Sequence, residues 1–211
     1  MTEDTLRRTA PGRRRMSRRE RENQLLDIAE ELFVERGYAD TSIEDIARAA
    51  GVTRPVVYEH HGNKEGIYLA CVRRARRRFE DAVQAAYRST DDPREQLARG
   101  ADAYFQVLEK DPRRWELLFG PSGLAADTLA RELNNERNRT VALVAELCQV
   151  HVPDADPMHV LAVAHAQSGC AEQLGRWWLT HRDVPRSTVV QYHVDLLWPG
   201  LQQLMHRYNP A

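Results

Sequence analysis

Helix start signals recur along this chain, and they constrain its fold more than any other feature. Three Asp-Pro pairs, Asp92-Pro93, Asp111-Pro112 and Asp156-Pro157, each place a capping carboxylate before a proline in the first turn, where no N–H is needed. Ser17 with Glu20 forms a capping-box pattern ahead of an apolar run. The chain is therefore expected to be a series of helices from residue 17 onwards.

Apolar residues between these signals recur at helical spacing. The first run follows the i, i+3, i+4, i+7, i+8 pattern of one helix face: Leu25, Ile28, Ala29, Leu32 and Phe33. No segment alternates polar and apolar residues over the length of a strand, which argues against a sheet. The sequence predicts an all-α chain of about nine helices, the last two over Leu161–Leu179 and Val189–Met205.

Charge divides the chain into two parts. Residues 1–80 hold 17 Lys and Arg against 14 Asp and Glu, a net charge of +3, whereas residues 81–211 hold 13 against 17, a net charge of −4. Residues 1–16 are rich in arginine and have almost nothing to bury, so we expect a disordered basic arm. A basic start before a more acidic body indicates a polyanionic partner for the N-terminal part only.

The cysteines and the lengths of the apolar runs indicate in which cellular compartment the protein is found. Cys71, Cys148 and Cys170 are widely spaced and form no CxxC pair, so we interpret them as buried thiols in a reducing compartment, with redox sensing as the alternative. No run approaches the ~18 apolar residues of a membrane span, and the start lacks the apolar stretch of a signal peptide. We expect a cytoplasmic protein that does not associate with a membrane.

The segment AGVTRPVVYEHHGNKEGIY, residues 50–68, predicts a helix-turn-helix. Gly51 can end one helix in the left-handed conformation, and Val52 is expected to plug the space between the two helices. Thr53 is expected to cap the next helix, and Pro55 falls in its first turn, where a proline costs nothing. The third helix of the chain is therefore expected over about Arg54–His60.

This short helix has two faces. Val57 is expected to face the first two helices, whereas Arg54, Pro55 and Val56 point outward. An arginine can pair with guanine and apolar groups can meet a thymine methyl, so this face suits a major groove, with a solvated bundle face as the alternative. Three groups at the far end would meet backbone phosphates: Tyr58, His60 and Lys64.

The segment TSIEDIARAAGVTRPVVYEHHGNKEGIYLA, residues 41–70, resembles the DNA-binding signature of TetR-family transcriptional regulators, and the resemblance extends over about Arg18–Val72. The matching positions are Thr41, Ile46, Ala47, Ala50, Gly51, Val52, Thr53, Tyr58, His60, Lys64 and Glu65. The resemblance implies a homodimer with a three-helix DNA-binding domain over residues 17–65 and a larger ligand-binding and dimerisation domain over residues 66–211. Carried over by position, the DNA-contacting residues would be Thr41, Thr53, Arg54, Pro55, Tyr58, His60 and Lys64.

One position departs from the family pattern. His61 stands where such proteins usually have a phenylalanine that packs into the small domain. Either His61 is a buried, hydrogen-bonded neutral imidazole, or the domain packs less tightly. Adjacent histidines on a helix point about 100° apart, and no Cys or carboxylate nearby completes a site with His60, so we expect no metal.

Two arginine runs have more than one interpretation. Arg13–Arg15 with Arg18 and Arg19 would track phosphates, or they form a solvated tail. Five more arginines lie between residues 73 and 78 of a later helix. These are expected to be mostly exposed or paired with acids such as Glu80 and Asp81.

The C-terminal body shows no Gly-rich phosphate loop, HExxH or GxSxG pattern, so we expect no catalytic residue and no cofactor. It does carry aromatic and polar residues that would suit a pocket for a small molecule. The candidates are Tyr104, Phe105, Trp115, Phe119, Asn134, Asn138, His165, Ser168 and Glu172. Any one of them alone is more readily explained as core or as interface, whereas the set as a whole favours a pocket.

The last two helices are expected to form a dimer interface. Ala164, Ala166, Ser168, Gly169, Ala171 and Gly175 would allow another helix to approach closely. The final helix carries Val189, His193, Leu196, Leu197, Gly200, Leu201 and Leu204 on one side, and Trp177 and Trp178 are expected to anchor the packing. Two such helices meeting their symmetry mates would make a four-helix interface with a two-fold axis.

These features lead to one main hypothesis. The chain is expected to be a ligand-responsive dimeric regulator, a repressor that binds a palindromic operator and is released by a small molecule. The alternatives are a helical enzyme or ligand-sequestering protein without DNA activity, and a thiol-switched regulator.

Overall fold

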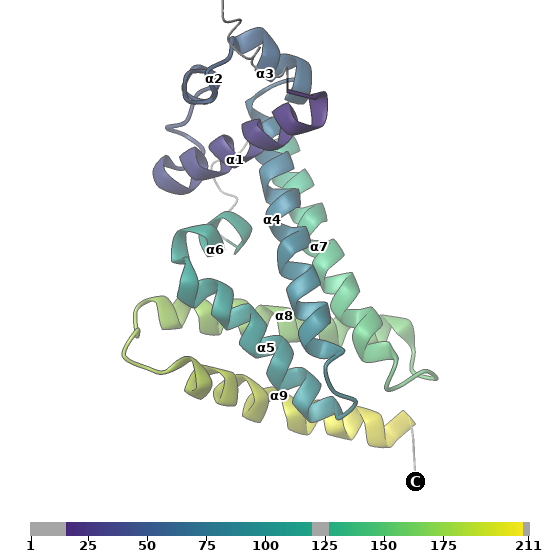
Figure 1. The fold of residues 1–211 in the computed structure, drawn as a ribbon. Helices are drawn as coiled ribbons and strands as arrows, with labels where there is room; N and C mark the ends of the chain where they lie inside the picture. Colours follow the sequence, from purple (N-terminus) through teal and green to yellow (C-terminus); the bar gives the residue numbers. More distant parts are fainter. Residues whose placement is uncertain (1–15, 120–126, 209–211) are drawn as a thin grey trace, which may run out of the picture.

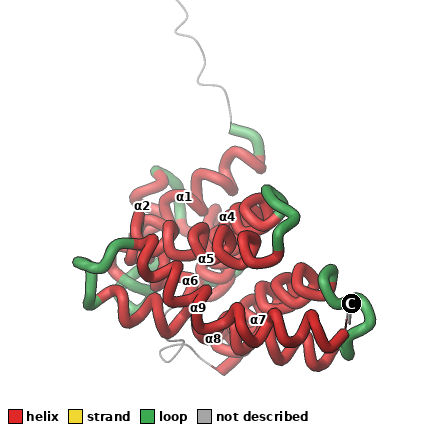
Figure 2. Tube along the Cα trace, turned by 90° about the horizontal axis from the view of Figure 1, so that it is seen from below, coloured by secondary structure: helices red, strands yellow, loops and turns green. Residues whose placement is uncertain are grey.

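The computed structural model describes residues 16–119 and 127–208, and these ranges contain helices and connecting turns but no strand (Figures 1 and 2). Nine helices occur in them, which confirms the all-α prediction. They are α1 (Arg18–Arg36), α2 (Ile43–Ala50), α3 (Arg54–His61), α4 (Lys64–Tyr87), α5 (Pro93–Lys110), α6 (Pro112–Phe119), α7 (Asp127–Gln149), α8 (Pro157–Leu179) and α9 (Arg186–Tyr208). The expected basic arm lies almost entirely outside the described residues.

The helices start where the capping residues predict. The backbone N–H groups of Glu95, Arg114 and Met158 donate to the carboxylates of the three Asp-Pro pairs, at 2.7, 3.0 and 3.0 Å. Ser17 and Glu20 form the expected capping box at α1. These bonds satisfy N–H groups that have no partner within the first turn of a helix. The positions at which the helices begin are therefore set by residues next to one another in the sequence.

The nine helices form a small cluster and a larger body (Figure 1). Helices α1, α2 and α3 lie together at one end, and the long α4 runs from this cluster into the body, where α7 lies beside it. Helices α5, α8 and α9 pack at the far end, and α6 lies between α1 and the body. Because α4 contacts both parts, it is the continuous element between them. No helix in the described ranges is both long and apolar enough to cross a membrane.

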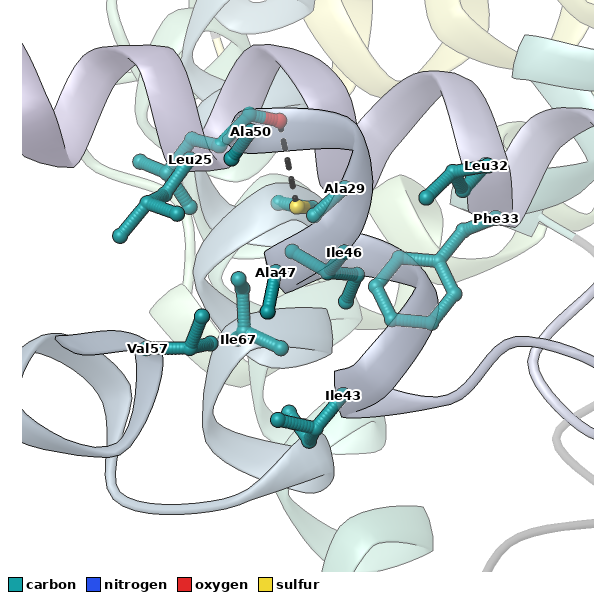
Figure 3. Packing of buried hydrophobic residues seen from close by; sticks show 12 residues of the cluster. Leu25, Ala29, Leu32, Phe33, Ile43, Ile46, Ala47, Ala50, Val57 and Ile67 are labelled. Atoms are coloured by element: carbon teal, nitrogen blue, oxygen red, sulfur yellow. Dashed lines mark hydrogen bonds between the residues drawn. The ribbon is translucent and has the colours of Figure 1, made fainter. Parts of the chain in front are cut away.

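A compact apolar core holds the three N-terminal helices against α4 (Figure 3). Leu25 and Ala29 of α1, Ile46 of α2, Val57 of α3 and Ile67 of α4 are all fully buried. Deleting a large apolar side chain from such a core costs roughly 2–5 kcal/mol, so the orientation of α3 is fixed by packing.

The body has an aromatic core. Phe79, Tyr104, Phe105, Trp115 and Phe119 are in edge-to-face or tilted contact, with ring centroids 5.1–6.5 Å apart. The indole N–H of Trp115 donates to the Tyr104 hydroxyl at 3.0 Å, so this large side chain is buried without an unpaired donor.

A buried carboxylate joins the small cluster to the body. Glu30 of α1 is 2% exposed and accepts from Arg74 of α4 at 2.6 Å and from Arg114 of α6 at 2.7 Å. Arg74 also pairs with Asp27 at 2.7 Å. Three helices from two parts of the chain therefore meet at one charge.

Most of the arginines of α4 are exposed or paired with acids, as predicted, but the partners and one burial differ from the sequence-based interpretation. The carboxylates that pair with Arg73 and Arg74 lie on α1 and α7, not at Glu80 and Asp81. Arg76 is 3% exposed, because its helix face points into the body. Charge alone does not reveal which arginines a tertiary contact will bury.

We predict that Glu30→Ala lowers the free energy of unfolding by roughly 3–5 kcal/mol, because it leaves Arg74 buried without its main partner. Chemical denaturation followed by circular dichroism measures this change. Glu31→Ala, at the exposed neighbouring position, is the matched control and should change stability by about 0.5 kcal/mol or less. Equal effects of the two substitutions would contradict the role of Glu30.

Candidate nucleic-acid interface and ligand cavity

The turn between α2 and α3 has the geometry that its sequence predicts. Gly51 adopts φ 64° and ψ 36°, the left-handed conformation that ends α2, and its N–H donates back into that helix. Thr53 is at the N-cap position of α3, but its side chain makes no capping hydrogen bond. The position was predicted correctly and the bond was not. The Thr53 side chain is exposed and remains available to another partner.

Helix α3 buries one residue and presents the others. Val57 is 0% exposed, whereas Thr53, Arg54, Pro55 and Tyr58 are exposed. Three more of the predicted contact residues are half-buried: Val56, His60 and Lys64. One face of α3 is therefore buried, and the opposite face offers the guanidinium of Arg54, the ring of Pro55, the hydroxyl of Thr53 and the phenol of Tyr58.

Two of the basic groups on this surface have internal partners. The Arg54 guanidinium donates to Glu44 of α2, and this ion pair raises the pKa of Arg54 and lowers that of Glu44. Lys64 donates to the carbonyl of Ala39 at 3.1 Å, and its ammonium lies 4.4 Å from the Tyr38 ring centroid. Both side chains are held near the surface in defined positions.

Thr41 is not part of this exposed surface. It is 1% exposed, and its hydroxyl donates to the carbonyls of Gly37 at 2.8 Å and Leu32 at 3.3 Å. Ser42, not Thr41, caps α2. The hydroxyl of Thr41 therefore holds the end of α1 against the start of α2.

His61 does not fit the first alternative, that of a buried and hydrogen-bonded imidazole. It is half-buried, and its Nε2 atom is shielded from solvent without a hydrogen-bond partner. Burial lowers the pKa of the imidazole, with His60 adding to the effect and Glu22 opposing it. No cluster of three or more His, Cys, Asp or Glu that could hold a metal occurs within residues 16–119 and 127–208.

We predict that His61→Phe raises the free energy of unfolding by about 1 kcal/mol at neutral pH, because it removes a buried unpaired nitrogen. The pKa of His61 is lower in the folded chain than its ordinary 6.5, so the unfolded chain binds the proton more readily. Stability should therefore fall as the pH drops below 6.5.

Denaturation midpoints between pH 7.5 and 5 measure this slope, which should be smaller in His61→Phe. The exposed His206→Phe serves as the control and should keep the wild-type slope. A slope unchanged in both variants would contradict the role of His61.

The body encloses a cavity of about 120 Å³ between α4, α5, α7, α8 and α9. Its walls are mainly apolar. Val83 of α4, Leu97 of α5, Leu143 and Leu147 of α7 and Leu201 of α9 are among the lining residues. Polar groups that also line it are Glu80, Gln96, Tyr104, Thr140, His151, Gln167, Ser168 and His193.

The predicted pocket residues are only partly brought together. Tyr104, Phe119 and Ser168 line the cavity, whereas Phe105 and Trp115 are 0% exposed and pack in the surrounding core. The others lie elsewhere: Asn134, Asn138 and His165 are exposed, and Glu172 is half-buried, 3.6 Å from Arg137.

Sequence reasoning missed the walls that α4 and α7 provide. Phe79 and Val83 on α4, and Leu143 and Leu147 on α7, lie at helical spacing, but a cavity wall and a packed core produce the same apolar pattern. His193 was assigned to an interface instead. It is 2% exposed, its Nδ1 atom has no partner, and burial lowers its pKa to about 4, so the ring is neutral at physiological pH.

The outer face of α8 and α9 carries exposed apolar groups. Trp177 is 38% exposed, Tyr192 49% and Leu196 66%. The sequence predicted that one side of α9 forms the dimer interface. This prediction is wrong for Val189, His193 and Leu204, which are buried within the same chain. Trp178 is also buried, and its indole N–H donates to the Val184 carbonyl at 2.7 Å.

The three cysteines are free thiols. Cys71 is buried as expected, and burial raises its pKa to about 12. Cys148 and Cys170 are half-buried rather than buried, and burial raises the pKa of both, to about 11 for Cys148. Because the thiolate is the reactive form, these environments disfavour rapid oxidation.

Two family profiles match the chain. The profile of the bacterial regulatory proteins, tetR family, matches residues 25–71, and that of the tetracyclin repressor-like C-terminal domain matches residues 82–211. The HTH-type transcriptional activator FasR of Mycolicibacterium smegmatis is 31% identical over 208 residues, which cover 93% of this chain and 91% of that protein.

Solved structures share the fold. A TetR-like transcriptional regulator from Rhodococcus sp. RHA1 is 26% identical, with a TM-score of 0.67 over 89% of this chain and 99% of that chain. The regulator FadR from Bacillus subtilis, solved in complex with stearoyl-CoA, is 18% identical, with a TM-score of 0.71 over 83% of this chain and 96% of that chain. The second likeness is one of fold alone.

Proposed function

Because this chain belongs to the tetR family of bacterial regulatory proteins, we propose that it binds a palindromic operator as a homodimer and that a small molecule in the body releases it. The family and the relatives are transcriptional regulators rather than enzymes. DNA-binding regulation is common to the family. What we propose for this chain in particular is that it is a dimer, that its operator is a palindrome and that it represses transcription.

The observation that carries the proposal is the two-sided packing of α3. Val57 fixes the helix in an apolar core, while Thr53, Arg54, Pro55 and Tyr58 stay exposed on the opposite face. A rigid helix that projects such side chains can enter a major groove and read base edges.

The proposed contact surface is Thr53, Arg54, Pro55, Val56, Tyr58, His60 and Lys64. Thr41 is left out because its hydroxyl is buried and donates to the carbonyls of Leu32 and Gly37. The ion pair with Glu44 would hold the Arg54 side chain in one position until a base edge replaces the carboxylate as its partner. We propose the domain boundary at residues 65–66, in the first turn of α4, although α4 itself continues into the body as far as Tyr87.

We propose that the exposed face of α8 and α9 joins two copies. Trp177, Tyr192 and Leu196 would be covered by the same residues of the partner about a two-fold axis. A two-fold dimer would place two α3 helices in successive major grooves, about 34 Å apart on a palindrome.

The cavity favours an elongated apolar effector. Its lining extends along α4 from Phe79 to Tyr87 and along α7 from Thr140 to Cys148, which at 1.5 Å per residue is roughly 12 Å in each helix. The fold neighbour from Bacillus subtilis was solved with a long acyl chain in stearoyl-CoA, which is consistent with this class of molecule.

The small size of the cavity supports a mechanism of release. About 120 Å³ is well below the roughly 300–1,000 Å³ of pockets that enclose a drug-sized ligand. A longer molecule would have to separate α4 from α7, and it would therefore bind an expanded state more tightly. Because α4 carries α3 at its start, expansion would change the spacing of the two recognition helices.

We predict that Arg54→Ala weakens binding to the operator by roughly 5- to 150-fold, as expected for loss of one base contact. The operator would first be selected from a random DNA pool, and fluorescence anisotropy at fixed salt would then measure affinity. Arg77→Ala makes the same charge change at an exposed position of α4 and should alter affinity less than about twofold. An equal loss on scrambled DNA would contradict base readout by Arg54.

We predict that 1-dodecanol, a neutral long-chain probe, releases the wild-type protein from the operator and that Gly100→Leu abolishes this response. A Cβ atom at Gly100 would meet nothing within 4 Å and the residue lines the cavity, so a leucine side chain would compete with a ligand for this space. Gly100→Ala is the matched control and should keep most of the response. The same anisotropy assay measures both, and an unchanged response of Gly100→Leu would place the effector elsewhere. Tighter binding on adding the alcohol would instead reverse the proposed sign of regulation.

A further inference from the structure

Three arginines from three helices converge on the C-terminal end of α6. Arg76 of α4 donates to the carbonyl of Leu118 at 2.6 Å. Arg176 of α8 and Arg137 of α7 both donate to the carbonyl of Phe119, at 2.5 and 3.4 Å. Neutral carbonyls, not carboxylates, are the acceptors at the centre of this cluster.

The positive charge of the cluster is only partly compensated. Glu172 lies 3.6 Å from Arg137, and Glu80 reaches Arg76 only through the hydroxyl of Thr140, which lies 3.1 Å from Arg76. Glu136 also acts on the charge of Arg76, but it is already paired with Arg73 at 2.8 Å and with Arg139 at 2.9 Å. The three guanidinium groups therefore face two carboxylates that are not paired elsewhere. Such an imbalance is costly in a buried environment, and it favours an additional anion.

Two N–H groups of the cluster have no acceptor among the described residues. They are the Nε–H groups of Arg76 and Arg137, both shielded from solvent. The Arg137 Nε atom lies 3.6 Å from a Glu172 oxygen, which is close enough for an ion pair but too long for a hydrogen bond. Arg76 is 3% exposed, and burial together with the neighbouring Arg137 lowers its pKa. A buried donor left unpaired costs roughly 1–3 kcal/mol, which a ligand oxygen would recover.

The cluster adjoins the polar end of the cavity. Thr140, Phe119 and Tyr104 line the cavity, and the first two also contact the arginines directly. The Tyr104 hydroxyl accepts from Trp115, and within the described ranges it donates to no acceptor of its own. Away from this end the walls of α4 and α7 are apolar, as at Val83 and Leu147.

We infer that the effector is an anionic amphiphile, an aliphatic carboxylate whose head group binds beside Arg76, Arg137 and Tyr104 and whose tail extends between α4 and α7. This inference rests on the proposed function of the cavity as the effector site. The carboxylate would supply the acceptors that the two Nε–H groups lack and would neutralise the excess charge.

The same site offers a path to the DNA-binding helices. A carboxylate at the arginines would compete with the carbonyls of Leu118 and Phe119, which end α6. Helix α6 also carries Arg114, whose guanidinium binds Glu30 of α1. Release of one end of α6 would therefore alter its contact with α1.

The test compares sodium dodecanoate with 1-dodecanol, which share a chain length and differ in head-group charge. Isothermal titration calorimetry on the full-length protein should show the carboxylate binding roughly 10- to 100-fold more tightly than the alcohol, as expected for charge-assisted hydrogen bonds. Arg137→Met should reduce this preference to within about threefold while leaving dodecanol affinity unchanged, and Arg137→Lys should retain part of it. Arg139→Met makes the same charge change two residues away, at a side chain that is 69% exposed, and should keep the wild-type preference.

Each other outcome overturns the inference. Equal affinity of wild type for acid and alcohol would mean that the arginines do not bind the head group, and it would leave the cavity as a site for neutral chains. An equal loss of both ligands in Arg137→Met would make that arginine structural. Tight binding of dodecanoyl-CoA that Arg137→Met does not alter would place the head group outside the cluster. If neither probe bound while operator binding persisted, both this inference and the proposed effector class would fail.

Discussion

The buried carboxylate of Glu30 is the interaction on which the arrangement of this protein depends. A charge that is 2% exposed is tolerable only when cations and hydrogen bonds surround it, and here they come from Arg74 and Arg114 on two other helices. The side chain therefore requires α1, α4 and α6 to meet at one point. Leu117 of α6 packs against the apolar core of the small domain beside this contact, so the joint has both a polar and an apolar part.

The ion pairs of Glu30 with Arg74 and Arg114 suit a protein in which a change in the body must alter the small domain. Apolar contacts tolerate small displacements, whereas a buried ion pair loses much of its energy when a partner leaves. One end of α6 is tied to α1 through Arg114, and the other end is held by Arg76 and Arg176 of the body. Helix α6 therefore has charged attachments on both sides, and its position depends on the balance between them.

Local sequence chemistry was sufficient for most of the fold and for the recognition helix. Capping carboxylates act within one turn, so the starts of α5, α6 and α8 follow directly from three dipeptides. The burial of Val57 also follows from helical periodicity. By contrast, the burial of Thr41 and Arg76 and the exposure of Asn134 could not be predicted, since each depends on which distant helix covers the residue. A pocket in the body was predicted, but most of its lining residues were missed for the same reason, because its walls come from five helices.

The sequence by itself determined an all-α chain, the capped starts of several helices and most of the exposed face of α3, because these depend on residues within a few positions of one another. The predicted helices over Leu161–Leu179 and Val189–Met205 were too short, since α8 begins at Pro157 and α9 extends over Arg186–Tyr208. Only the tertiary structure decided where the arginines of α4 go. It placed Arg74 at a buried carboxylate of α1 and Arg76 among two other arginines at the end of α6. Periodicity specifies which residues share a helix face, but which other helix packs against that face depends on the packing of the whole chain.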